Sequence, residues 1–154
     1  MADLDTKVAN ILRVKFKMNL FKNYYTDPSR QAILLDPKHK EAAKNQALQC
    51  PVLLQNKNKT LPVNRNIATL AVIGALADDP DNQIGCWAPD GKAQDSITPL
   101  TSLKAALSKT KINYAPGYKS STSTDKSLFA AAIAAATSSE KVLLFVGESN
   151  DLSG

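Results

Sequence analysis

Histidine and cysteine are scarce in this chain, and their scarcity excludes several kinds of site. His39 is the only histidine among 154 residues. Zinc sites that rely on histidine, and triads that use a histidine base, therefore have at most one residue to draw on. Cys50 and Cys86 form neither a disulfide framework nor a metal-ligand spacing. We expect no metal site, and we expect His39 to be a solvated residue near the start of a helix.

Long hydrophobic runs are also absent. No stretch approaches the roughly 18 to 20 apolar residues that a membrane-spanning helix needs, so we predict no membrane partner. The opening residues, MADLDTKVAN, lack the charged and apolar regions of a secretory signal. We therefore expect no signal peptide in this chain, and its cellular compartment stays open.

The net charge of +5 is unevenly distributed along the chain. Residues 1–66 hold 12 Lys and Arg against 5 Asp and Glu, whereas residues 67–154 hold 7 against 9. A basic region of this kind can attract nucleic acid. Its lysines, however, are scattered through helical patterns with no interleaved aromatic residues and no RNA-binding signature. We interpret them as a solvated helix face and predict no nucleic-acid partner.

A helix followed by an irregular connector is predicted at the start of the chain. Residues 4–18 show the apolar spacing of one helix face, formed by Leu4, Val8, Ile11 and Leu12. Asn19 follows, and asparagine tolerates the left-handed conformation in which helices often end. Residues 20–35 contain a proline and no clear period, so we predict a linker there. Nothing adjacent in the sequence offers the first helix a packing partner.

The second predicted helix has a clear start signal. Asp36 can act as its N-cap and Pro37 occupies the first helical position, where the missing N–H costs nothing. We expect this helix to end or kink near Pro51. Val52–Leu54 is then a candidate for a short strand, followed by a polar turn.

From residue 67 onward the pattern alternates between short apolar runs and helical segments. Near-continuous apolar runs of this length, separated by helices, are typical of a parallel sheet covered by helices, so we predict the α/β class. The third of these apolar runs is followed by residues 148–154, which we expect to belong to a loop. The predicted order is strand 67–74, loop 75–96, helix 98–109, strand 112–115, loop 116–124, helix 128–138 with Asp125 or Ser127 as cap, and strand 141–147.

Ligands of such sheets bind beyond the carboxyl ends of the strands. The loops expected at that edge are 74–96, 116–124 and 147–154. Gly74 follows a strand, but the sequence after it contains no G-x-G-x-x-G, so a dinucleotide site is not predicted. Asp78 and Asp79 also follow this strand. We favour a solvated loop or a carboxylate bonded to nearby N–H groups over a phosphoryl acceptor, because no lysine ends the strand 141–147.

Several segments, taken in order, resemble the family 3 glycoside hydrolases. ILRVKFKMNLFKNYYTDP (11–28) resembles the closing helix and exit of that family's barrel domain. The segment from AAKNQ to LADD (42–79) resembles the entry into its second domain. The resemblance covers the chain from about Val8 to Gly154. The remaining segments that carry it are IGCWAPDG, ITPLTSLKAAL, INYAPGY and VLLFVGESNDLSG.

The resemblance implies a two-domain retaining β-glycosidase, often a β-glucosidase or β-xylosidase, that needs no cofactor. In that family a (β/α)8 barrel supplies the aspartate nucleophile, and a loop of the second domain supplies the acid/base. The two carboxyl groups must lie about 5–5.5 Å apart. The resemblance implies that the barrel strand with the nucleophile is not among these residues. Glu148 is the candidate acid/base, although the resemblance places the family's glutamate one or two residues beyond Gly154.

Trp87 and Asp90 are the candidate sugar-binding residues. They share the loop before residue 96 with Gly91. An aromatic ring can stack on the apolar face of a pyranose while nearby carboxylates bind its hydroxyls, and the resemblance implies such an aromatic wall here. The alternative is a tryptophan that fills core space under a long loop.

Together these features predict a flavodoxin-like α/β sandwich that is only partly present. Residues 1–19 are expected to be a remnant barrel helix, residues 20–35 a linker, and residues 36–154 a truncated second domain. The expected function is that of an inactive fragment of a β-glycosidase, with β-linked glucosides or xylosides as substrates if a barrel is supplied. The alternative is a non-catalytic sugar-binding or protein-interaction module. The unpartnered apolar face of the first helix predicts self-association, and the parent family is often secreted or periplasmic.

Overall fold

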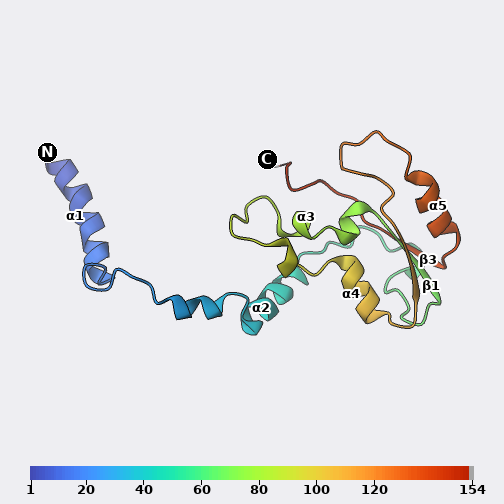
Figure 1. Ribbon diagram of the computed structural model, residues 1–154, viewed down its shortest axis with the longest axis horizontal. Coiled ribbons are helices and arrows are strands. Elements are labelled where there is room, and N and C mark those ends of the chain that lie inside the picture. Colours follow the sequence, from blue (N-terminus) through green and yellow to red (C-terminus); the bar gives the residue numbers. More distant parts are fainter. Residues whose placement is uncertain (153–154) are drawn as a thin grey trace. The chain divides into compact units, whose positions relative to one another are not determined.

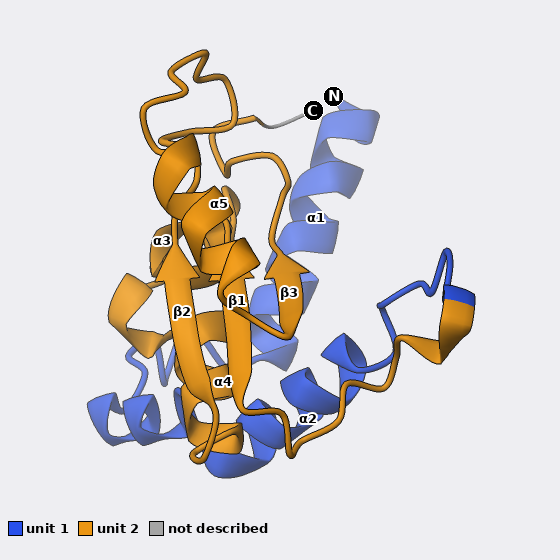
Figure 2. Cartoon of the chain, turned by 90° about the vertical axis from the view of Figure 1, so that its right-hand side faces the viewer, with its two compact units in different colours: residues 1–57 blue, residues 58–154 orange. Residues whose placement is uncertain are grey.

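The chain divides into two compact units. A computed structural model describes residues 1–152, and its residues group into unit 1, residues 1–57, and unit 2, residues 58–154 (Figure 2). From the sequence we predicted that the second domain begins at residue 36. In the structure the helix that follows Asp36 groups with unit 1.

Unit 1 opens with α1 (Ala2–Lys17), the helix that the apolar spacing predicted. Asp3 and Asp5 lie in its first turn and lysines in its last turn, where they complement the helix dipole. Asn19 follows with a φ of 57°, the left-handed conformation expected of it. No side chain of α1 is buried. Its apolar face is exposed at every position, by 40% to 61%, at Leu4, Val8, Ile11 and Leu12.

Two further helices follow in unit 1. The connector holds a 3-10 helix, η1 (Pro28–Ile33), whose cap Asp27 accepts a hydrogen bond from Ser29 N. The start signal of α2 (Pro37–Ala47) is confirmed, because the Asp36 carboxylate accepts from Lys38 N at 2.8 Å. His39 is exposed on its first turn, as expected. A short 3-10 turn, η2 (Lys57–Lys59), lies where the units join in sequence.

The strand predicted for Val52–Leu54 is wrong. These residues lie in no strand, and their side chains are 64% to 92% exposed. A strand is defined by its partner, and the three strands of the sheet pair only with one another within the described residues. A run of three apolar residues next to a proline has too few hydrogen-bonding positions to add itself to that sheet.

Unit 2 is built on a three-stranded parallel sheet, which confirms the predicted α/β class. β1 lies in the centre, with β2 and β3 on either side. Its elements, in chain order, are β1 (Thr69–Ile73), η3 (Ala75–Asp78), α3 (Pro80–Ile84), η4 (Ala93–Asp95), α4 (Pro99–Ala106), β2 (Lys111–Ala115), α5 (Phe129–Thr137) and β3 (Lys141–Leu144).

Helices α4 and α5 lie on opposite sides of this sheet (Figure 1). Leu70 and Val72 of β1 are fully buried, and they form the core with Leu100 and Leu107 of the α4 region. Alternation along β1 turns the intervening residues to the other face, where α5 packs on β1 and β2. The helix predicted for residues 98–109 is therefore confirmed as α4, and its leucines contribute to the core of unit 2.

A glycine sets the distance between the ends of β1 and β3. Gly74 has a φ of 124°, and a Cβ placed on it would lie 2.0 Å from the carbonyl oxygen of Phe145. Beside it, Phe145 N donates to Ile73 O at 2.7 Å and Gly74 N donates to Ala115 O at 3.1 Å. All three strands are thus tied together at their carboxyl ends. The chain after Phe145 consequently leaves the sheet beside the residues that follow Ile73.

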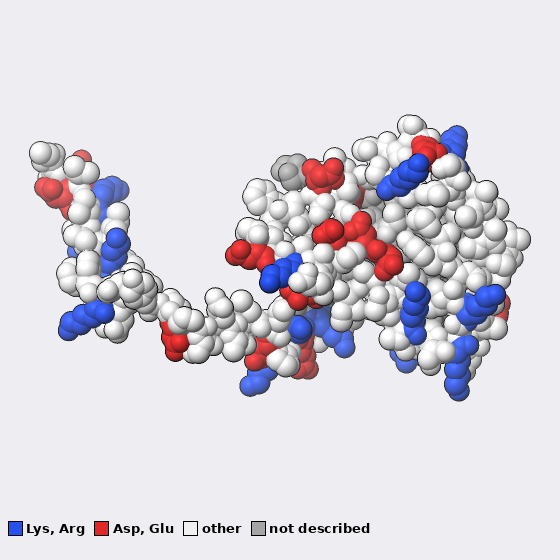
Figure 3. Space-filling view, viewed as in Figure 1, with Lys and Arg blue, Asp and Glu red and all other residues white. Residues whose placement is uncertain are grey.

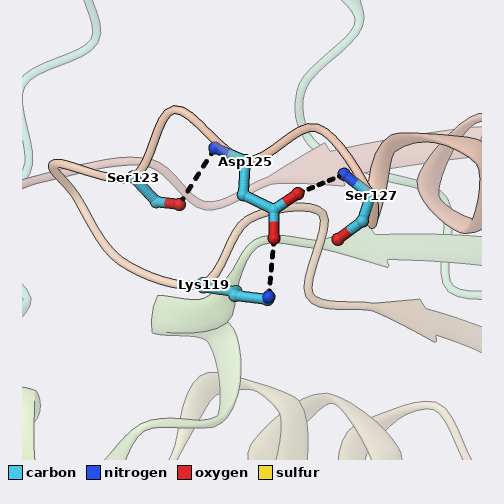
Figure 4. Close-up of polar contacts among 4 residues, drawn as sticks. All are labelled: Lys119, Ser123, Asp125 and Ser127. Carbon is cyan, nitrogen blue, oxygen red and sulfur yellow. Dashed lines mark hydrogen bonds and ion pairs between the residues drawn. The ribbon is translucent and has the colours of Figure 1, made fainter.

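Two predicted details of the loops are corrected by the structure. The segment 75–96 is not a continuous loop, because it contains α3 between two 3-10 turns. Neither Asp125 nor Ser127 caps α5, whose N-cap is Leu128. Asp125 instead forms a turn before the helix. One carboxylate oxygen accepts from Ser127 N at 2.8 Å and the other lies 2.6 Å from Lys119 Nζ (Figure 4).

Candidate functional site

The loops predicted to meet at the carboxyl edge of the sheet do meet there. The Tyr118 hydroxyl donates to Phe145 O at 3.1 Å, and Ser121 Oγ lies 2.9 Å from Ser149 Oγ. These contacts join loop 116–124 to the segment after β3. On its other side, that segment is bonded to α3, because Asn150 N donates to Asn82 Oδ1 at 2.6 Å. The edge therefore forms one continuous surface of three loops.

Asp79 organises the α3 side of this surface. It is the N-cap of α3, and its Oδ1 accepts from Asn82 N at 3.0 Å while its Oδ2 accepts from Asn82 Nδ2 at 2.6 Å. Of the two interpretations favoured for Asp79, a solvated loop or a carboxylate bonded to nearby N–H groups, the structure shows the second. Neither Asn82 nor Asn150 was predicted from the sequence as part of this edge. The Asp79–Pro80 pair was a usable signal for a helix start, since it repeats the cap and proline of α2.

Glu148 borders a shallow hollow at this edge. The hollow has a volume of about 190 Å³, and Glu148 itself is exposed. The hollow lies between the end of β3, the start of α4 and helix α3. The lining residues are Leu76, Asp79, Asn82, Gln83, Pro99 and Glu148.

A second, smaller hollow of about 70 Å³ adjoins the first. It shares Leu76, Asp79 and Asn82 with the hollow beside Glu148. Its other side is lined by residues of loop 116–124, with Lys119, Ser120 and Ser121 among them, together with Ser149. Side chains of these types can bind the hydroxyls of a sugar.

Trp87 and Asp90 lie apart from both hollows. Neither residue lines them, and both belong to the segment between α3 and η4, where Gly91 N closes a turn onto Ala88 O at 3.0 Å. The side chain of Trp87 is 85% exposed. This exposure excludes the alternative in which Trp87 fills the core beneath its loop. A stacking role for Trp87 and a hydroxyl-binding role for Asp90 stay predictions.

The electrostatic character of this edge is acidic. Figure 3 shows Asp and Glu side chains gathered over α3 and its neighbouring loops, the stretch that carries Asp78, Asp79 and Asp81. Tyr114 of β2 responds to this field. Burial raises the pKa of its hydroxyl above 10.0, and the charges of Asp78, Tyr118 and Asp79 add to the rise. An acidic edge disfavours anionic ligands and is compatible with neutral sugars.

Within residues 1–152, no group of three or more His, Cys, Asp and Glu side chains is placed to hold a metal ion. Over the same residues, no helix is both long enough and apolar enough to cross a bilayer. The two cysteines, Cys50 and Cys86, are free and exposed.

Most of this chain matches a known protein family. Residues 51–154 match the model of the glycosyl hydrolase family 3 C-terminal domain. The chain belongs to glycosyl hydrolase family 3. The resemblance found in the sequence is thereby confirmed, and the carboxyl edge described above belongs to the second domain of that family.

Curated relatives of this family 3 chain are β-glucosidases and β-xylosidases. The periplasmic β-glucosidase of Salmonella typhimurium is 34% identical over 128 residues, which cover 76% of this chain and 16% of the relative. The lysosomal β-glucosidase of Dictyostelium discoideum is 33% identical and covers 94% of this chain and 19% of its own length. The match to a β-xylosidase of Formosa agariphila is 32% identical and covers 100% and 22% respectively.

A solved β-glucosidase structure has the same fold. The β-glucosidase of Listeria innocua in complex with glucose superposes on 93% of this chain with a TM-score of 0.77 and 26% sequence identity. The superposed region is 19% of that enzyme. The chain thus spans about a fifth of the length of the relatives that it matches.

Proposed function

We propose that this chain contributes part of the second domain of a retaining β-glycosidase that hydrolyses terminal β-D-glucosides or β-D-xylosides. A family 3 barrel supplies the attacking aspartate in this proposal, and no cofactor takes part. The observation that carries it is the family match together with Glu148, which borders a hollow at the carboxyl edge. The 154 residues alone do not hydrolyse glycosides, because the second carboxylate is missing.

Asp79 is a candidate for the second carboxylate, because it lines the same hollow as Glu148. A retaining enzyme needs one carboxylate free to attack the sugar and a second group to move the proton. Both oxygens of Asp79 accept hydrogen bonds from Asn82, at 3.0 and 2.6 Å. A carboxylate held in this way caps a helix, and breaking these bonds would cost α3 its start. We therefore assign Asp79 a structural role.

The organisation of the chain follows from the same proposal. Residues 1–19 form the closing helix of the barrel, residues 20–35 the linker, and residues 36–154 the first part of the second domain. The exposed apolar face of α1 supports this assignment, since a helix of this kind needs a partner surface. In the absence of a barrel, that face is free to associate with other copies.

The first experiment measures hydrolysis by the purified chain. A chromogenic β-glucoside and a β-xyloside are each incubated with the 154-residue protein and with an equal amount of a family 3 β-glucosidase. We expect no turnover above the buffer rate from the chain. Turnover by the chain that is lost in the Glu148→Gln and Asp79→Asn variants would show that the 154 residues contain a complete pair of catalytic acids. That result would overturn the proposal.

A second experiment supplies the barrel. Residues 51–152 replace the equivalent segment of the β-glucosidase of Listeria innocua, and hydrolysis by the graft is measured with and without Glu148→Gln. If Glu148 is the acid/base, this change lowers kcat by about 10²–10⁴-fold, the usual contribution of general acid–base catalysis. If the acid/base lies beyond Gly154, kcat is unchanged. A graft that folds yet never hydrolyses the substrate contradicts the assigned domain role.

A second candidate function is sugar binding without catalysis. The observation that favours it is Trp87, which is 85% exposed and therefore free to stack on a pyranose. Titration with glucose and xylose should then change Trp87 fluorescence in a saturable way, and Asp90→Ala should weaken the binding. Because Trp87 is the only tryptophan, its emission reports on this loop alone. An unchanged emission would exclude this candidate.

A further inference from the structure

The side-chain amide of Asn82 donates a hydrogen bond through its nitrogen and accepts one through its oxygen. On one side, its Nδ2 donates to Asp79 Oδ2 at 2.6 Å. On the other side, its Oδ1 accepts from the backbone N of Asn150 at 2.6 Å. Asn150 lies 68 residues further along the chain, in the segment that follows Glu148. A single side chain thus connects the cap of α3 to the loop that carries Glu148.

This connection has independent support on both sides. The side chain of Asn150 donates back to Asp81 O at 3.0 Å, so two hydrogen bonds join the loop to α3. Ser149 is joined to Ser121 of the neighbouring loop at 2.9 Å and also donates to Asp151. Before Glu148, the chain is fixed by the 2.7 Å bond from Phe145 N to Ile73 O. Glu148 therefore lies in a short segment fastened at both ends.

An amide fits the position of residue 82. A carboxylate of Asp79 can accept and cannot donate, whereas the backbone N of Asn150 can donate and cannot accept. The residue between them must offer a donor to the first and an acceptor to the second. Asparagine does both, and this requirement fixes the orientation of its amide. Aspartate at position 82 would keep the shape and set two carboxylates 2.6 Å apart, a repulsive arrangement.

We propose that Asn82 is the positioning residue that holds the loop carrying Glu148 at the carboxyl edge, by joining Asn150 to the cap of α3. The significance of this loop rests on the proposed glycosidase function, whereas the connection itself can be tested without any substrate. Asn82 touches no reacting group in this proposal. It acts through the backbone of the loop.

The test exchanges two residues in a way that keeps all three hydrogen bonds and reverses the direction of only the one between the two side chains. In the double variant Asp79→Asn with Asn82→Asp, the amide and the carboxylate change places. Residue 79 still offers an oxygen to the N–H of residue 82, its amide donates to the new carboxylate, and that carboxylate accepts from Asn150 N. The net charge and the side-chain sizes are unchanged, and asparagine is as good an N-cap as aspartate. Asn82→Asp alone supplies the mismatched pair.

The measurement is hydrogen exchange of the Asn150 amide in the full 154-residue chain, followed by NMR. We expect Asn82→Asp to speed exchange of this amide about tenfold, the factor that one hydrogen bond commonly contributes to an equilibrium. The double variant should return the rate to that of the unmodified chain. The Val72 amide of buried β1 should exchange alike in all three proteins, which shows that the sheet is intact.

Two results would overturn the proposal. One is an Asn150 amide that exchanges equally in the unmodified chain and in Asn82→Asp. The other is a double variant that fails to restore protection while Val72 stays protected. Failure of the glycosidase function is separate, because it would appear in the hydrolysis assays of the chain and of the graft and would leave these exchange rates untouched.

Discussion

Replacing Gly74 by alanine should be the most damaging single-methyl change in unit 2. The added Cβ would lie 2.0 Å from Phe145 O and 2.9 Å from the carbonyl carbon of the same residue. Both are backbone atoms, so no side-chain rotation can relieve the overlap. To make room, the end of β3 must move away from β1, and this movement breaks the 2.7 Å bond from Phe145 N to Ile73 O.

The cost has two parts that a matched variant separates. Gly74 and Gly85 both have positive φ, of 124° and 76° respectively, so alanine at either position carries backbone strain of about 1–3 kcal/mol. A Cβ added at Gly85 would meet no atom within 4 Å, so Gly85→Ala carries that strain alone. Gly74→Ala adds overpacking of about 1–3 kcal/mol and the loss of a hydrogen bond of about 1 kcal/mol. We expect it to be the more destabilising by about 2–4 kcal/mol.

The assay is urea unfolding followed through the NMR amide signals of Leu70 and Val72, which belong to the buried strand of unit 2. Signals from this strand exclude any contribution from unit 1. The free energies of unfolding of the two alanine variants are compared with that of the unmodified chain. Equal destabilisation by Gly74→Ala and Gly85→Ala would refute the reasoning, because it would mean that β3 does not approach β1 as closely as the structure has it.

Three further predictions concern charge and surface. The hydrogen bond from Lys119, followed by that from the Ser127 N–H, lowers the pKa of Asp125 below 3.8. The stability that this contact contributes is present above the ordinary aspartate pKa and is lost as the pH falls through the lowered pKa. Lys119→Ala should therefore raise the pKa of Asp125, as measured by NMR titration of its carboxyl group. Burial, followed by the charge of Asp78, raises the pKa of Tyr114 above 10.0. The stability that the protonated Tyr114 hydroxyl contributes is present below pH 10 and is lost as the pH rises through the raised pKa. Tyr114→Phe should remove this loss of stability, as measured by unfolding at increasingly alkaline pH. The exposed apolar face of α1 should drive self-association of the chain, and a charge introduced by Ile11→Glu should reduce the apparent mass in analytical ultracentrifugation.

The sheet could be predicted from the sequence because its signals are local and redundant. Residues 67–74 form an apolar run too continuous for a surface strand, and β1 is indeed buried between two helices. Thr98 and Pro99 mark the start of α4 through a cap and a fixed φ, and the Thr98 hydroxyl accepts from Thr101 N at 3.2 Å. Where both the period and the cap agreed, the predicted element was confirmed.

The errors arose where one signal was taken without the other. Val52–Leu54 has strand composition, but composition does not supply a neighbouring strand, and the side chains stay exposed. Conversely, α3 is only five residues long and polar, so it has no apolar period to detect, even though Asp79 and Pro80 announce it. Short helices of this kind are fixed by their caps and their tertiary contacts.

The candidate site was only partly predictable for a related reason. The parallel topology alone placed the three loops at one edge, and the contacts of Ser121 and Asn150 confirm that meeting. The partners within the edge were not predictable, because Asn82 and Asn150 are 68 residues apart and neither belongs to a local motif. Their pairing depends on the close approach of the ends of β3 and β1, which the absence of a Cβ on Gly74 permits beside Phe145.

These observations connect the stability of a very short helix to the geometry of the loop beside it. A helix of five residues cannot persist through its own hydrogen bonds, so α3 depends on the cap that Asp79 provides. Asp79 uses its second oxygen to orient Asn82, which in turn holds Asn150. Formation of α3 and placement of the loop after Glu148 are therefore not independent events, because they share one carboxylate. A substitution that removed the cap would release the loop as well, although it lies far away in the sequence.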